Sequence, residues 1–220
     1  MKIRFKFSKE TPLKFISHLD LQRLFIRAFR RAKIAMSYKG GFNPQPKLSF
    51  ASALPLGYTS SGEYLEVEIE EELEPGEAEK MLTEQLPFGI SLLGADEVPQ
   101  NLSSLMTRVK FFLYKIKFET AVPLNTEQLE EAVIRLLTRE EIQITRRSKK
   151  GTKQINIIPY IMDLKVLPQE TNFQKVHVIE MHSEMSPEGT VKPVEIMKLM
   201  EEENPFKITK MEIHREAIYL

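Results

Sequence analysis

The chain has 220 residues, 42% of them hydrophobic and 28% charged, enough for one large domain or two small domains with hydrophobic cores. Cysteine is absent, which excludes disulfides, thiolate nucleophiles, zinc fingers and cysteine-ligated iron–sulfur clusters. No run approaches about eighteen apolar residues, and the first ten residues alternate basic with apolar side chains instead of forming a signal peptide. We therefore expect a cytoplasmic protein without a membrane span.

Basic and acidic residues balance at 31 each, but they are segregated along the chain. Residues 1–50 contain 12 Lys or Arg and 2 Asp or Glu, a net charge of +10, whereas residues 51–100 contain 1 and 12, a net charge of −11. A chain with this distribution can present a basic surface although its overall charge is zero.

The first half predicts the element order β-α-β-β-α-β. Residues 2–7 alternate as a strand, and Ser17 is a plausible N-cap for a helix that runs to about Lys33. Glycine and proline in the segment 40–57 indicate a shaped loop that leads into a short strand. The next expected elements are a strand at 63–70, a helix at 75–86 and a strand at 90–93.

The second half repeats this order with a longer middle. Its expected strands and helices are a strand at 109–118, a helix at 126–138, a strand at 141–145 that ends in a basic turn, strands at 155–167 and 175–182, a helix at 194–202 and a strand at 208–213. Residues 98–106 are polar and rich in Pro, Asn and Ser, which favours a linker. The sequence thus predicts an α+β protein of two tandem ferredoxin-like domains with antiparallel sheets, at 1–97 and 107–220.

This fold makes the first and third strands neighbours. Their outward residues would then bring opposite charges together on one face: Lys2, Arg4 and Lys6 beside Glu66, Glu68 and Glu70. Because such cross-strand pairs attract, we expect the basic first strand to be neutralised within its own domain.

Two basic segments are candidates for phosphate binding. The predicted first helix carries four arginines opposite its apolar face, and the segment 145–153 forms a basic turn. With two lysines near the loop, the candidate RNA-binding residues are Arg23, Arg27, Arg30, Arg31, Lys39, Lys47, Arg146, Arg147, Lys149, Lys150 and Lys153. The alternatives are a solvated helix face, pairing of the arginines with the acidic stretch 63–79, and a solvated hairpin tip.

The loop GGFNPQP at 40–46 is more elaborate than a simple connection. Phe42 offers a stacking face and Asn43 a hydrogen bond to a base edge, whereas the alternative is a rigid loop that packs Phe42 into the core. Ser17, His18 and Asp20 include the residue types of a hydrolase triad, but neighbours on one helical turn lack its geometry, so capping explains Ser17 and Asp20 better. His18 is a weak candidate for a general acid or base in RNA cleavage, and we assign no catalytic residue.

The four histidines have no metal-ligand spacing, so we expect neither a metal nor a cofactor.

Residues 12–69, from PLKFISHLD through GGFNPQP to EYLEVEI, resemble the core signature of the radical SAM-linked protein family, a bacterial domain of unknown function. NIIPYI at 156–161 is also similar. The family pattern falls on Ser17, His18, Leu19, Asp20, Arg23, Gly41, Phe42, Asn43, Pro44, Pro46, Ser49, Phe50, Gly57, Gly62 and Glu63. Gln45 departs from it, because a histidine usually lies between the two prolines, and this departure argues against a catalytic or metal role there.

The resemblance implies a protein fused behind, or encoded beside, a radical SAM protein, with genes near those for ribonuclease G and a large-subunit ribosomal protein. That context implies work on rRNA or tRNA. Without cysteine the chain is not itself the radical SAM enzyme. The leading hypothesis is therefore a non-catalytic RNA-binding accessory module that acts with a radical SAM partner, with no role for DNA or a membrane. The alternatives are a metal-independent endoribonuclease that uses His18 and a pure protein-interaction scaffold.

Overall fold

The computed structural model describes residues 1–148, 151–168 and 174–220. The chain forms a mixed α+β fold with mostly antiparallel strands, and the described part contains four α-helices. It divides into two compact units. The first comprises residues 1–109 together with 215–220, and the second comprises residues 110–214.

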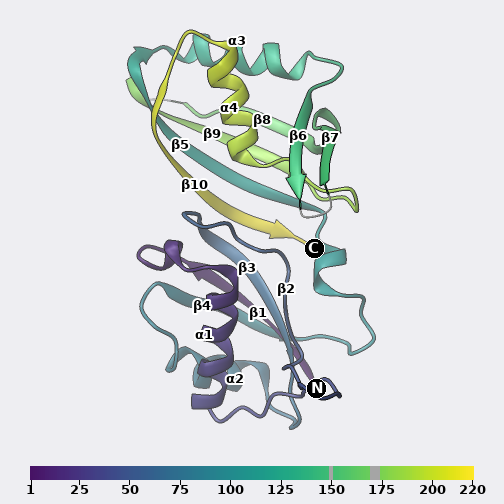
Figure 1. Cartoon of the computed structure of the whole chain (residues 1–220). Helices are drawn as coiled ribbons and strands as arrows, with labels where there is room; N and C mark the ends of the chain where they lie inside the picture. The colour runs from purple at the N-terminus through teal and green to yellow at the C-terminus, as the bar shows by residue number, and fades with distance from the viewer. Residues whose placement is uncertain (149–150, 169–173) are drawn as a thin grey trace. The chain divides into compact units, whose positions relative to one another are not determined.

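The first unit is a sheet with helices on one face (Figure 1). Its elements are β1 (Lys2–Lys9), the 3₁₀ turn η1 (Leu13–Phe15), α1 (His18–Arg31), β2 (Leu48–Phe50), β3 (Thr59–Glu68), α2 (Pro75–Thr83), β4 (Ile90–Glu97) and the 3₁₀ turn η2 (Leu105–Arg108). The strand order is β4-β1-β3, and β2 pairs with β3. All of these pairings are antiparallel.

Local sequence explains the central helix of this unit. The Ser17 hydroxyl accepts a hydrogen bond from the Asp20 amide at 3.2 Å and so caps α1. The apolar face of α1 then packs on the inward side chains of β1, where Phe25 meets Phe7 edge to face at 4.9 Å between ring centroids. The buried residues of the two elements are Ile3, Phe5, Phe7, Leu21, Phe25, Ala28 and Phe29.

The second unit contains a sheet and a separate hairpin. Its elements are β5 (Phe111–Leu124), α3 (Thr126–Leu137), β6 (Gln143–Ser148), β7 (Gly151–Asn156), the 3₁₀ turn η3 (Ile158–Tyr160), β8 (Ile161–Val166), β9 (Gln174–Glu184), α4 (Pro193–Glu203) and β10 (Ile208–Tyr219). The sheet order is β10-β5-β9-β8, and β6 pairs only with β7. The last residues of β10, from Arg215 onward, belong to the first unit.

Several segments differ from the sequence expectations. The strands expected at 90–93, 109–118 and 208–213 extend to Glu97, Leu124 and Tyr219. The expected strand 155–167 is divided, because residues 158–160 form a 3₁₀ turn that contains Pro159 and separates β7 from β8. The strand expected at 63–70 begins earlier, at Thr59, since the start of β3 lies against the end of β10. Residues 98–106, the expected linker, lie in the first unit, where Val98 and Leu105 are buried.

Two kinds of feature are absent from the described residues. Among residues 1–148, 151–168 and 174–220, no three His, Asp or Glu side chains gather to hold a metal ion. No helix within the same ranges has the length and apolar character needed to cross a membrane.

Candidate nucleic-acid interface and a buried ionic cluster

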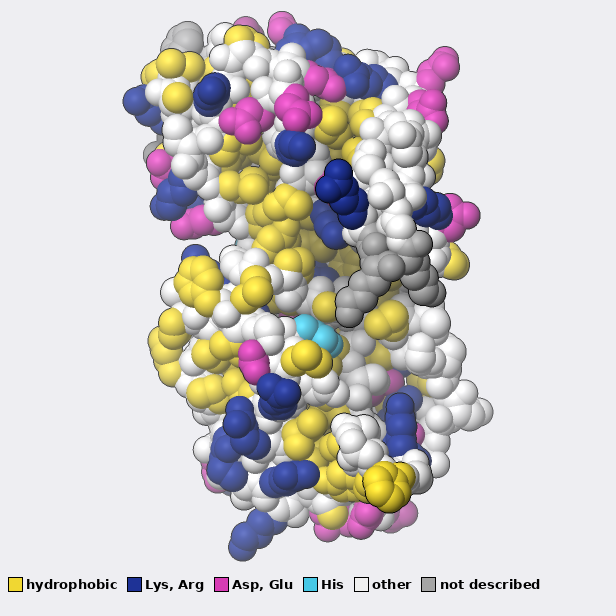
Figure 2. Space-filling model, in the orientation of Figure 1, with side chains coloured by type: hydrophobic (Ala, Val, Ile, Leu, Met, Phe, Trp, Pro, Cys, Tyr) yellow, Lys and Arg dark blue, Asp and Glu magenta, His cyan; other side chains and the backbone are white. Residues whose placement is uncertain are grey.

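The arginine face of α1 is exposed, and Figure 2 shows Lys and Arg side chains gathered over this helix. Arg23 forms an exposed ion pair with Asp20 at 3.4 Å. Arg30 donates a hydrogen bond to the Tyr38 hydroxyl, and Arg31 donates one to the Gln85 carbonyl. In the described part of the chain, the remaining arginines (Arg27, Arg30 and Arg31) pair with no carboxylate, so the acidic stretch does not neutralise them.

The loop between α1 and β2 projects from a closed base. The Lys39 amide donates to the Gln45 carbonyl at 2.9 Å, and a β-bridge joins Tyr38 to Pro46. Phe42 lies at the tip and is fully exposed, so it does not pack into the core. Lys39 is exposed as well. The Lys47 ammonium already pairs with the Glu68 carboxylate at 2.6 Å, which makes Lys47 a weaker candidate for phosphate binding than Lys39.

The basic turn of the second unit is the β6–β7 hairpin. Arg146 is engaged within the protein, because its Nε and Nη2 bind the Glu195 carboxylate at 2.9 and 2.6 Å and Nη2 also donates to the Thr190 carbonyl. Arg147 and Lys153 are exposed. The other two predicted residues, Lys149 and Lys150, lie outside the described residues.

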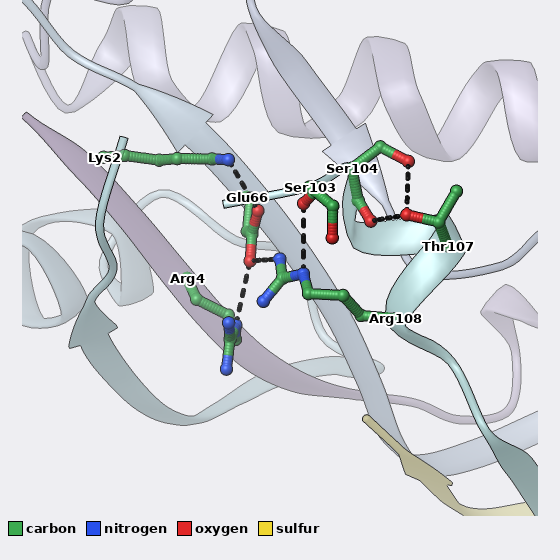
Figure 3. A network of polar contacts seen from close by, with 7 residues as sticks. All are labelled: Lys2, Arg4, Glu66, Ser103, Ser104, Thr107 and Arg108. Carbon is green, nitrogen blue, oxygen red and sulfur yellow. Dashed lines mark hydrogen bonds and ion pairs between the residues drawn. The ribbon is translucent and has the colours of Figure 1, made fainter. Parts of the chain in front are cut away.

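The outer face of β1 and β3 is neutralised as expected. Glu66 is 1% exposed and pairs with Lys2 and Arg4, each at 3.0 Å, and with Arg108 of η2 (Figure 3). Burial opposes ionisation of this carboxyl, but hydrogen bonds from the three cations outweigh it and hold the Glu66 pKa below its usual value. These cations therefore stabilise the unit and leave the outer sheet face a poor candidate for RNA binding.

The inner face contains a buried ionic cluster that the sequence did not indicate. Lys9, Glu63 and Arg215 are 1%, 2% and 1% exposed, and Arg215 Nε lies 2.9 Å from Glu63 Oε1. Lys9 Nζ donates to the Ile16 carbonyl at 3.3 Å. Burial lowers the Lys9 pKa, an effect that Glu63 opposes and Arg215 reinforces. Lys9, Glu63 and Arg215 thus bring opposite charges together on the same face as the apolar core.

His18 borders this cluster as the first residue of α1. Its ring packs edge-on against Phe50 at 5.2 Å between centroids, and its Nδ1 is buried with no hydrogen-bond partner among the described residues. Burial lowers the His18 pKa, Glu63 raises it and Lys9 lowers it further, so the imidazole is neutral near pH 7. The Ser17 hydroxyl bonds to Asp20 and not to His18, which confirms the capping interpretation over a triad.

Several positions of the family pattern meet at this end of the unit. Gly62 is required there, because a Cβ at this position would lie 2.7 Å from the Glu216 carbonyl oxygen. Lys9 and Arg215 were missed by sequence reasoning. The sequence did contain a signal for the burial of Lys9, because Lys9 continues the buried odd-numbered positions of β1. It contained no signal for Arg215, which lies 152 positions after its partner Glu63.

Comparison with known proteins identifies the family of this chain. Residues 2–193 match the model of a family described as "uncharacterized protein conserved in bacteria (DUF2344)", and the chain belongs to that family. No curated protein matches.

Two solved structures are similar over 97% of the chain, each at 11% identity. One, in the crystal structure of a Cbf5-Nop10-Gar1 complex, has a TM-score of 0.48, and the match spans about half (49%) of that chain. The other, an unknown protein from Galdieria sulphuraria, has a TM-score of 0.27 and is covered over 97% of its length.

Proposed function

We propose that this protein is a non-catalytic RNA-binding module that serves a radical SAM partner in the modification of rRNA or tRNA. The observation that carries the RNA-binding part is the surface of α1. Arg27, Arg30 and Arg31 point outward without carboxylate partners in the described residues, and a loop with an exposed aromatic ring begins beside Arg30. Guanidinium groups bind phosphate oxygens bidentately, and aromatic rings stack on bases.

The β6–β7 hairpin supports the same proposal as a second contact. Residues that face each other in this ladder share a side, so Arg146 and Lys153 lie on one face while Arg147 and Thr152 lie on the other. Because Glu195 holds Arg146, the hairpin is anchored to the start of α4. The exposed Arg147 and Lys153 are then the described cations of this hairpin available to phosphates.

The partnership with a radical SAM enzyme rests on the sequence resemblance. A radical SAM enzyme binds its cluster through cysteines, of which this chain has none, so the partner must supply that chemistry. The role left to this chain is to bind the RNA and present it.

We further infer that both units are variants of the ferredoxin-like fold. In chain order the strands β1, β2, β3 and β4 form the antiparallel arrangement 4-1-3-2, with α1 after the first strand and α2 after the third. The strands β5, β8, β9 and β10 repeat it, with the β6–β7 hairpin as an insertion after α3.

Filter retention of labelled tRNA and rRNA fragments at about 50 and 200 mM salt tests RNA binding. Contacts with several phosphates predict a loss of about a thousandfold in affinity over that range. The double variant Arg27→Glu/Arg30→Glu should bind more weakly and with a flatter salt dependence. The double variant Lys198→Glu/Lys207→Glu, at two exposed lysines of the second unit, is the charge-matched control. Absence of RNA binding at low salt, or equal losses in both variants, would refute the proposal.

One observation favours the endoribonuclease as a second candidate. The neutral His18 imidazole, with an unpartnered buried Nδ1 in the described structure, lies beside the Lys9 ammonium, and one imidazole with one cation suffices for RNA cleavage. This candidate requires cleavage in EDTA that disappears in His18→Ala. Intact RNA after prolonged incubation with the wild-type protein would eliminate it.

A further inference from the structure

The full exposure of the Phe42 side chain is energetically unfavourable and needs a physical explanation. Its side chain has essentially no contact with the protein, and leaving a phenylalanine in water instead of burying it costs about 1.5–3 kcal/mol. The loop that carries the ring is nevertheless fixed at its base. The Lys47 amide donates to the Ser37 carbonyl at 2.8 Å, and the Ser37 amide donates to the Glu68 carbonyl at 2.8 Å, so the base of the loop is fixed to β3.

The backbone of the tip is shaped to present this ring. Gly41 has a φ of +121°, in a region that favours glycine, and it immediately precedes Phe42. Pro44 and Pro46 hold the returning arm extended. The loop is therefore a built projection with one aromatic side chain at its end.

The surroundings of the tip are cationic and polar. Lys39 and Asn43 are exposed on the loop, and Arg30 reaches its base through the Tyr38 hydroxyl at 3.3 Å. Glu68, the carboxylate below the loop, is paired with Lys47. A protein partner would be expected to contact a contiguous apolar patch, and a single ring flanked by cations does not provide one. A nucleic-acid base can stack on such a ring while the cations bind the phosphates on either side of the base.

From this arrangement we infer that the loop 38–46 recognises single-stranded RNA by stacking an unpaired base on Phe42. Arg30 and Lys39 bind the phosphates on either side, and the Asn43 amide is placed to read the edge of the stacked base. A base inside a duplex already stacks on its neighbours, so double-stranded RNA gains nothing from this ring. The inference rests on the proposed RNA binding and specifies its substrate as unpaired RNA.

The test compares Phe42→Ala with Phe88→Ala, an equally large ring that is 86% exposed between α2 and β4 of the same unit. The probe is a 12-nucleotide single strand that contains 2-aminopurine, with its blunt-ended duplex as competitor and a DNA strand of the same sequence as a second competitor. Phe42→Ala should weaken single-strand binding about 5- to 150-fold, the equivalent of about 1–3 kcal/mol for one stacked base, and should abolish the quenching of 2-aminopurine. Phe42→Tyr should restore both, and Phe88→Ala should change neither.

The salt dependence separates stacking from charge. Loss of a neutral ring leaves the slope of log K against log salt unchanged, whereas Arg30→Gln reduces it by about one phosphate contact. Binding by the wild-type protein with no loss in Phe42→Ala would overturn the stacking inference and leave the proposed function standing. Equal losses for single strand and duplex would overturn it too, as would intact RNA binding with loss of a partner protein. No RNA binding by the wild type would instead refute the proposed function itself.

Discussion

Glu63→Gln should destabilise the first unit more than any exposed substitution of the same kind. A carboxylate oxygen of Glu63 lies 2.9 Å from Arg215 Nε, and the charge of Glu63 also acts on Lys9. All three residues are at most 2% exposed. The substitution keeps the shape of the side chain but removes the negative charge that lies beside two buried cations. Breaking a buried ion pair in this way costs about 3–5 kcal/mol of unfolding free energy.

Glu68→Gln is the matched control, because this glutamate lies on the same strand and pairs with Lys47 at 2.6 Å while its side chain is 31% exposed. Partly exposed pairs of this kind contribute about 0–1 kcal/mol. Urea unfolding followed by circular dichroism would measure both variants, and hydrogen exchange in peptides from β1 and β3 would assign the loss to the first unit. Equal costs for the two variants would refute the claim that the inner cluster depends on the Glu63 carboxylate.

The same variant has a predictable pH dependence. Burial already lowers the Lys9 pKa and Arg215 lowers it further, so removal of Glu63, which raises it, lets Lys9 lose its proton closer to neutral pH. The unfolded chain keeps that proton up to its ordinary pKa of 10.5, so the folded variant gains stability as pH rises. The loss of unfolding free energy in Glu63→Gln should therefore shrink as the pH rises toward 10.5. If the loss of unfolding free energy is the same at every pH, the Lys9 pKa does not depend on the Glu63 charge.

The remaining predictions concern both units. Burial lowers the pKa of His18 and of His177, so the unfolded chain takes up protons at these positions before the folded protein does. The free energy of unfolding should therefore be constant above about pH 6.5 and fall as the pH drops below it. Unfolding measured at graded pH should show a weaker fall in His18→Gln and in His177→Gln. Gly62→Ala should cost about 1–3 kcal/mol through a clash with the backbone of β10, whereas Gly76→Ala, which meets no atom within 4 Å, should be neutral or stabilising by urea titration. Arg146→Met should lower the unfolding free energy of the second unit by about 1.5–3 kcal/mol in the same titration, with protection from hydrogen exchange lost in β6 and β7.

Local patterns in the sequence account for most of the helices and strands. Alternation predicted β1, and the Ser17 cap with helical periodicity predicted α1 within two residues of its observed end. The neighbouring charges of β1 and β3 were also predictable, since Lys2 and Arg4 do pair with Glu66. These successes share a cause, because each depends on residues that are close in sequence or opposite each other in one ladder.

The inner cluster was beyond such reasoning. Lys9 continues the buried odd-numbered positions of β1, but the strand predicted from the sequence ended at residue 7, and the sequence does not show which charges meet Lys9 in the interior. Its partner Arg215 arrives from a strand at the other end of the chain. The third cation on Glu66, Arg108, comes from a 3₁₀ turn 42 positions away, at the start of the segment expected to form the second domain. Contacts of this range appear only when the fold is known.

The basic hairpin shows why composition alone overestimates a nucleic-acid surface. Arg146 and Arg147 are adjacent in the same basic run, yet one holds Glu195 while the other is exposed. Loss of Arg146 would weaken RNA binding only because the hairpin loses its anchor, and the stability of the second unit would fall with it. Loss of Arg147 should weaken binding at full stability and reduce the salt slope by about one phosphate contact. Mutagenesis of this segment therefore identifies an RNA contact only when affinity and stability are measured on the same variant.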